Sequence, residues 1–203
     1  SSVTSVTIPD SVTSIGSSAF NGCALTDIYF TGTEEQWQAI KGLSEAGLPQ
    51  NATIHYNTTL DENGIAYTSN GDGTCSVRCI KEELSLPEPL QLIIPEKSPQ
   101  GDIVTAIQDR GFFGSNFRSF IIPDTVVSIG AEAFGENHSL VKITLPDSVT
   151  ELGEGVFIRC YYLERVELPE NLIRLPASAF EGCEALYDVI LPESLTEIGE
   201  RAF

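Results

Sequence analysis

Two histidines and five cysteines are the side chains of this chain best suited to catalysis or metal binding. His55 and His138 each lack a serine or cysteine nucleophile in a known motif nearby, so neither predicts a hydrolytic triad. Cys75 and Cys79 are four residues apart, a spacing unlike that of a zinc knuckle. The sequence therefore predicts no enzyme active site, no metal site and no cofactor.

Two acidic turns resemble calcium-binding loops only superficially. Asp61-Glu62-Asn63-Gly64 and Asn70-Gly71-Asp72-Gly73 each bring several oxygen atoms together. Neither continues to the glutamate that a calcium loop needs at its twelfth position. We interpret both segments as ordinary turns.

Three cysteines occupy the same phase of a periodic pattern. Cys160 and Cys183 are 23 residues apart, and Cys23 has the same phase. Equivalent positions on successive coils of a solenoid are about 5 Å apart, which a disulfide can span. We favour buried free thiols, because free cysteine is commonly buried and Asn137 takes this position one repeat earlier. The redox compartment stays open.

The element that must position all these residues is a repeat of 23 residues. A constant period of this length predicts a solenoid, in which each unit buries its apolar face against its neighbours. The period is marked by evenly spaced prolines and phenylalanines: Pro123, Pro146, Pro169 and Pro192, and Phe134, Phe157, Phe180 and Phe203.

The clearest repeat covers residues 140–160. Apolar residues alternate with polar ones around Ile143, which predicts a short strand. Pro146 has no amide hydrogen and ends that strand. Gly153 permits a tight turn, and Phe157 fills the core from a short helical turn.

The N-terminal part of the chain predicts the end of a first repeat array. Thr33-Glu34-Glu35-Gln36 has the form of a capping box, which predicts a helix carrying Trp37 and Ile40. This atypical unit would close the exposed core, and residues 51–56 would add a last strand. We therefore expect residues 1–57 to be the C-terminal end and cap of a first array.

A second array is expected to follow a hairpin. Asn70-Gly71-Asp72-Gly73 lies between two short apolar runs, which is a strong hairpin signal. Leu92 restarts the repeat pattern, and the hairpin would seal the end of the core. We expect residues 58–203 to be the hairpin-capped start of a second array, truncated at Phe203. The chain would then be a fragment, and targeting signals would lie outside it.

The repeats resemble a known family. Units of the form Ile-Pro-x-x-Val-x-x-Ile-Gly-x-x-Ala-Phe-x-x-Cys-x-x-Leu, at Ile8–Leu25 and Ile122–Leu140, are similar to BspA-like (treponemal-type) leucine-rich repeats. The stretch from Tyr29 to Trp37 resembles the closing unit of those proteins. The resemblance implies a β-rich leucine-rich-repeat solenoid, α/β horseshoe-like, with 23-residue repeats, an inserted β-hairpin and a short capping helix.

The best candidate site is the concave face of the strand stack. Residues on either side of each strand's middle apolar position point away from the core. Lys142 and Arg165 would form a small basic island, Ile121 and Ile190 would be exposed apolar residues, and Tyr29 would be the single exposed aromatic ring. The predicted binding residues are Asp27, Tyr29, Ser119, Ile121, Lys142, Thr144, Arg165, Glu167, Asp188 and Ile190.

The composition excludes some classes of binding partner. A net charge of −18 repels nucleic acid and anionic lipid, and no apolar run is long enough to span a bilayer. The sequence predicts a non-enzymatic extracellular module that binds a protein through the concave face. The resemblance implies a secreted or cell-surface protein of host-associated bacteria that adheres to host matrix or cell-surface proteins. The alternatives are a passive spacer that displays other domains, or a face of ordinary solvated sheet residues.

Overall fold

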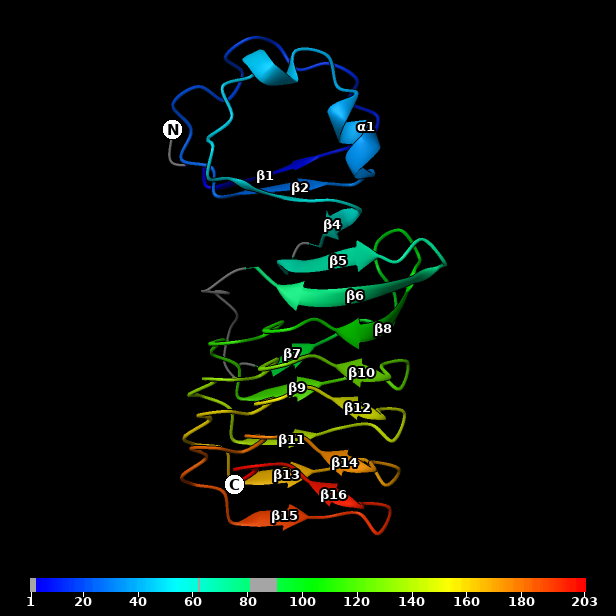
Figure 1. Cartoon of the computed structure of the whole chain (residues 1–203), viewed down its shortest axis with the longest axis vertical. Coiled ribbons are helices and arrows are strands. Elements are labelled where there is room, and N and C mark those ends of the chain that lie inside the picture. Colours follow the sequence, from blue (N-terminus) through cyan, green and yellow to red (C-terminus); the bar gives the residue numbers. More distant parts are fainter. Residues whose placement is uncertain (1–2, 62, 81–90) are drawn as a thin grey trace.

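The computed structural model describes residues 3–61, 63–80 and 91–203. Successive coils of the chain stack along one long axis, from the N-terminal coils at the top of Figure 1 to the last coil at the bottom. Two hydrophobic cores fill the stack. The first lies among residues 6–56, and the second, larger core lies among residues 65–202.

The first core is covered by three short parallel strands in the order β1-β2-β3. Because side chains alternate along a strand, Ile28 and Phe30 of β2 point into this core and are fully buried. The elements of this part are β1 (Ser5–Ile8), β2 (Asp27–Phe30), α1 (Glu34–Gln38), the 3₁₀ helix η1 (Leu43–Glu45) and β3 (Thr53–His55).

The predicted capping box is confirmed. Thr33 N donates to Gln36 Oε1 at 2.8 Å, and Gln36 N donates to Thr33 Oγ1 at 3.3 Å. Trp37 is buried and packs edge-on against Phe30 at 5.2 Å between ring centroids. The prediction that this helix also carries Ile40 is wrong: α1 ends at Gln38, and Ile40 reaches the core from the following turn. No helix among the described residues is long and apolar enough to cross a membrane.

The predicted hairpin is also confirmed. β5 (Ile65–Ser69) and β6 (Thr74–Cys79) pair antiparallel, with β4 (Thr58–Leu60) on the other edge of β5. Asp72 Oδ1 accepts hydrogen bonds from the backbone and hydroxyl of Thr74 at 2.9 and 2.6 Å. Asp61 Oδ1 likewise accepts the amides of residues 63 and 65. These carboxylates stabilise turns, as the sequence indicated.

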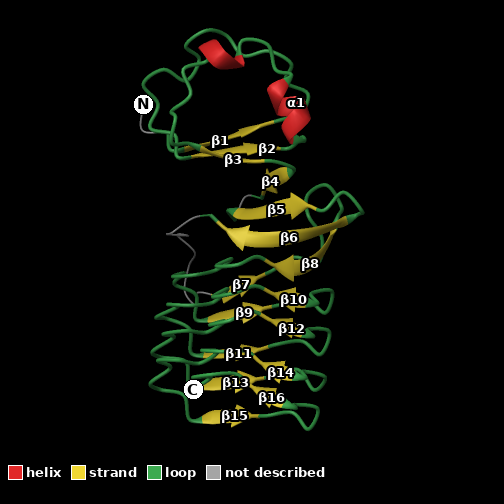
Figure 2. Cartoon of the chain, in the orientation of Figure 1, coloured by secondary structure: helices red, strands yellow, loops and turns green. Residues whose placement is uncertain are grey.

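Residues 91–203 form a solenoid with two columns of parallel strands (Figure 2). One column holds three-residue strands: β7 (Gln91–Ile93), β9 (Ser119–Ile121), β11 (Lys142–Thr144), β13 (Arg165–Glu167) and β15 (Asp188–Ile190). The other holds β8 (Ile103–Ile107), β10 (Ser128–Ile129), β12 (Glu151–Leu152), β14 (Arg174–Leu175) and β16 (Glu197–Ile198). The predicted repeat solenoid is confirmed, with turns in place of the helices of a horseshoe.

A column of phenylalanine rings runs through the second core. Phe134, Phe157 and Phe180 are buried, and consecutive rings stack with centroids 5.6 and 5.5 Å apart. The column continues to Phe112 at one end and Phe203 at the other. The 23-residue period thus places one ring on each coil at the same point of the core.

Beside this column, small polar side chains bond to the preceding coil. The thiols of Cys160 and Cys183 donate to the carbonyls of Phe134 and Phe157 at 3.0 and 3.1 Å. The amide of Asn137 donates to the carbonyls of residues 112 and 134, both at 2.8 Å. Cys160 and Cys183 are free thiols. The neighbouring Cys183 and burial together raise the pKa of the Cys160 thiol.

Gly153 has a different role from the one expected. Its φ angle is not positive, so the turn does not need the left-handed freedom of glycine. A Cβ atom here would lie 2.2 Å from the backbone nitrogen of Ala131 on the preceding coil. The absence of a side chain therefore allows close approach between coils.

Candidate protein-binding surface

The three-residue strands align their outward side chains into two rows across one face, which we call the long-strand face. Parallel pairing places Lys142 beside Arg165 and Arg165 beside Asp188. The complete first row is Gln91, Ser119, Lys142, Arg165 and Asp188, and the second is Ile93, Ile121, Thr144, Glu167 and Ile190. The predicted alignment of Lys142 with Arg165 and Asp188, and of Thr144 with Glu167 and Ile190, agrees with the strand register.

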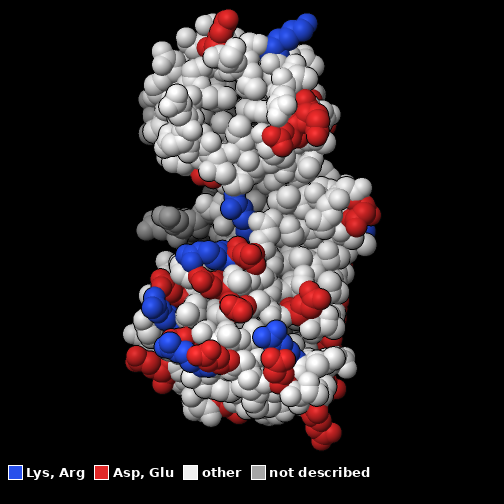
Figure 3. All heavy atoms as spheres, in the orientation of Figure 1, with Lys and Arg blue, Asp and Glu red and all other residues white. Residues whose placement is uncertain are grey.

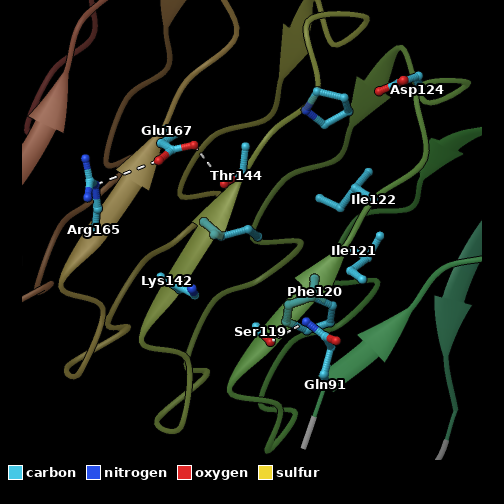
Figure 4. Close-up of a pocket in the computed structure, with 12 residues that line it drawn as sticks. Gln91, Ser119, Phe120, Ile121, Ile122, Asp124, Lys142, Thr144, Arg165 and Glu167 are labelled. Carbon is cyan, nitrogen blue, oxygen red and sulfur yellow. Dashed lines mark hydrogen bonds and ion pairs between the residues drawn. The ribbon is translucent and has the colours of Figure 1, made fainter.

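These rows border a continuous shallow groove. One part lies over β9, β11 and β13 (Figure 4). The residues that line it include Gln91, Lys142 and Glu167. A second part shares Thr144 and Glu167 with the first and extends to Ile190. The groove follows the strand ends and the proline turns that begin at Pro146 and its equivalents. Its open, extended shape suits a polypeptide better than a small molecule.

The predicted basic island is wrong, because Arg165 is neutralised by its neighbours. Arg165 Nε lies 3.2 Å from Asp188 Oδ2 and 3.8 Å from Glu167 Oε1. Thr144 donates its hydroxyl to the other oxygen of Glu167 at 3.0 Å. Lys142 forms no ion pair with any described residue, and Figure 4 shows it apart from these contacts. Among the described residues of the two rows, Lys142 is therefore the one positive charge without an ion pair.

The apolar residues of the second row are exposed as expected. Ile121 and Ile190 have 45% and 69% of their surface accessible to water. Ile93 was missed by the sequence analysis, although it is 59% exposed and pairs with Ile121. The insertion between these two strands breaks the 23-residue spacing, but the shared Leu-Ile and Phe-Ile strand pattern could have revealed it.

Tyr29 contradicts the prediction of an exposed aromatic ring on this surface. Only 2% of its surface is accessible, because the ring of His55 stacks on it at 4.8 Å. His55 Nε2 also lies 2.7 Å from Asp27 Oδ1. Arg78 of the hairpin reaches the same imidazole, with Nη2 3.1 Å from Nε2. Asp27 and Tyr29 thus belong to the contact between strands β2 and β3 and the hairpin.

The electrostatics of this junction follow from those contacts. Partial burial acts to raise the pKa of Asp27, but hydrogen bonds with His55 and Thr26 outweigh it and lower that pKa. Burial, followed by the charge of Asp27, raises the pKa of Tyr29. The carboxylate form of Asp27 is therefore the form that holds the junction together.

Other exposed aromatic residues lie in the segments before the strands and were not among the predicted binding residues. Tyr161, Tyr162 and Tyr187 are 38%, 63% and 76% exposed, and they precede the strands β13 and β15. His138 stacks on Tyr161 at 5.0 Å. These residues lie outside the strand positions from which the binding residues were predicted.

Both histidines are occupied by contacts with neighbouring side chains. His55 is engaged by Asp27 and Arg78, and His138 by Tyr161. Across residues 3–61, 63–80 and 91–203, no three His, Cys, Asp or Glu side chains are placed to hold a metal ion. The groups on the long-strand face can form ion pairs, hydrogen bonds and apolar contacts with a macromolecule.

Comparison with known families agrees with this geometry. The family model for the BspA-type leucine-rich repeat region matches residues 1–57 and 105–203, in six copies. This chain belongs to the BspA-type leucine-rich repeat family. In that family the leucine-rich repeat is generally a protein-interaction fold without catalytic activity. No curated protein matches the sequence significantly.

Several solved structures of bacterial leucine-rich repeat proteins resemble this member of the BspA-type family. A protein from Bacteroides ovatus has a TM-score of 0.51 and 23% identity over 97% of this chain and 48% of its own. The pneumococcal vaccine antigen PcpA has a TM-score of 0.52 and 18% identity over 72% and 47%. A leucine rich cell surface protein from Faecalibacterium prausnitzii has a TM-score of 0.48 and 27% identity over 89% and 51%. The chain spans about half the length of these three.

Proposed function

We propose that this chain is a non-enzymatic, extracellular protein-interaction module that binds a protein partner across the long-strand face. The observation that carries the proposal is the second row, where three exposed isoleucines flank Thr144 and Glu167 on one open surface. Covering one such side chain stabilises a complex by up to about 1.5–3 kcal/mol. Host matrix or cell-surface proteins are the partners that the family resemblance implies, in a secreted or surface-anchored protein.

The charges of the face support recognition of a specific partner. Lys142 is exposed and unpaired among the described residues, so an acidic group of a partner can approach it. Arg165 is already paired, so its contribution to binding is smaller.

The division at residues 57 and 58 into two arrays is part of this proposal, and the two hydrophobic cores support it.

A passive spacer is the second candidate. The contacts of Arg165 with Asp188 and of Thr144 with Glu167 satisfy polar groups within the sheet itself. A surface that is satisfied in this way can remain in water without a partner, and the solenoid would then hold other domains away from the cell.

A binding screen against immobilised extracellular-matrix and host-surface proteins separates these two functions. We expect saturable binding that is lost in Ile121→Asp and weakened in Lys142→Glu. The matched control is Ile173→Asp, because Ile173 is 61% exposed and precedes β14 in the other strand column. Binding that Ile121→Asp and Ile173→Asp reduce equally would contradict the long-strand face, and no binding to any protein would favour the spacer.

A further inference from the structure

Four exposed aromatic side chains lie at the ends of three successive coils, in the segments that lead into strands of the long-strand face. We call this group the aromatic corner, and it consists of His138, Tyr161, Tyr162 and Tyr187. The backbone amide of Ala185 donates to the carbonyl of Tyr161, and that of Tyr187 to the carbonyl of Glu164, so the coils that carry these rings are adjacent. In Figure 1 these segments lead into the left ends of β11, β13 and β15.

The repeat fold does not require aromatic residues at these positions. Tyr162 is replaced by serine at 139 and alanine at 185 on the neighbouring coils, and Tyr161 by glutamate at 184. No hydroxyl group of the three tyrosines bonds to a residue that the structure describes. Large exposed aromatic side chains dominate the affinity of protein interfaces. The rings therefore point to a ligand rather than to a need of the fold.

The charges around the aromatic corner are unbalanced. Glu164 and Glu184 are exposed, and neither forms an ion pair within the described part of the chain. The nearest arginines in sequence are already used, since Arg159 pairs with Glu136 at 3.2 Å and Arg165 with Asp188 at 3.2 Å. Figure 3 shows acidic and basic side chains side by side over the C-terminal coils. By the 23-residue spacing, Glu164 and Glu184 occupy the positions of Tyr187 and Tyr161 on adjacent coils, so their carboxylates remain available to a cation that contacts the rings.

We propose that the aromatic corner binds an arginine-rich, extended segment of a partner protein. A guanidinium group stacks on tyrosine rings through cation–π attraction and donates paired hydrogen bonds to a carboxylate. The net charge of −18 attracts such a segment from a distance. This site is separate from the long-strand face and does not rest on the function proposed for it. Sugars also stack on aromatic rings, but the unpaired carboxylates favour a cationic ligand.

The test is fluorescence anisotropy of a labelled peptide of alternating arginine and serine, titrated with the whole chain. We expect saturable binding in low salt that weakens about tenfold when the salt concentration is raised beyond the physiological range. Tyr161→Ser with Tyr162→Ser should weaken it at least about tenfold, and so should Glu164→Gln with Glu184→Gln. The matched control, Glu151→Gln with Glu193→Gln, removes the same charge from exposed positions elsewhere and should change affinity less than about twofold.

Three results would overturn the proposal. Equal losses in the two glutamine variants would mean that the peptide is attracted by net charge alone. Unchanged binding in the tyrosine variant, with an unchanged thermal melt, would exclude the rings. Tyrosine-dependent binding of neutral oligosaccharides without peptide binding would make the corner a sugar site. Ile121→Asp should leave peptide binding intact, so failure of the long-strand face and failure of this site are distinguishable.

Discussion

Replacing Phe157 with alanine tests whether the ring column holds the coils together. The ring is fully buried and stacks between Phe134 and Phe180 at 5.6 and 5.5 Å. Removing a fully buried phenylalanine leaves a cavity and lost contacts, at a cost of about 3–5 kcal/mol in the free energy of unfolding. At about 2–4 °C for each kcal/mol in a chain of this size, the melting temperature should fall by roughly 6–20 °C.

Equilibrium unfolding in urea, followed by circular dichroism, measures that cost. The matched control is Phe203→Ala, because Phe203 stacks on one ring only and is 61% exposed, so its loss should cost about 1 kcal/mol or less. Lys142→Ala, on the exposed face, should stay within about 0.5 kcal/mol of the unmodified chain. A cost below about 1 kcal/mol for Phe157→Ala, or one equal to that of Lys142→Ala, would refute the assigned core.

Three further predictions concern the backbone, the junction and the thiols. Gly155→Ala should lower the free energy of unfolding in urea by about 1–2 kcal/mol, because Gly155 has a φ angle of +61°. An added Cβ would make only ordinary contacts, the nearest 3.4 Å from Cγ of Glu132, so the cost comes from the backbone conformation. An unchanged free energy of unfolding would contradict a strained backbone at this turn. Asp27→Asn should destabilise the chain near neutral pH but not in acid. The folded pKa of Asp27 lies below its usual 3.8, so its stabilisation is present above that pH and is lost as the pH falls through the folded value. A difference independent of pH would contradict this. Iodoacetamide should alkylate Cys183 before Cys160 at neutral pH, because the contact with Cys160 lowers the pKa of Cys183 while Cys160 is fully buried; mass spectrometry showing the reverse order would contradict it.

The parts of the fold that depend on local pattern could be predicted from the sequence. The spacing of Pro146 and Phe157 with their equivalents specifies one coil, and parallel stacking of identical coils then determines that Lys142 lies beside Arg165. The capping box at Thr33 and the hairpin turn at residues 70–73 could also be predicted, because each depends on residues that are close together in the sequence.

The parts that depend on contacts between distant residues could not be predicted. The alternation of side chains along β2 predicts that Tyr29 points outward. The ring is nevertheless buried, because His55 and Arg78, which come from later elements, cover it. The neutralisation of Arg165 is different: it could have been predicted, because the correct register already placed Asp188 next to Arg165 in the same row. The tyrosines of the aromatic corner were missed because they lie outside the strands, where the repeat places no constraint on residue type.

Hydroxyl-radical footprinting of the complex with a captured partner tests the central claim most directly, because it measures side-chain exposure at each residue. Our account predicts that oxidation of Ile93, Ile121 and Ile190 falls when the partner is bound. Oxidation of Ile173, which precedes β14 of the other strand column, should stay unchanged. Protection of Ile173 with continued oxidation of Ile93 and Ile121 would contradict binding across the long-strand face.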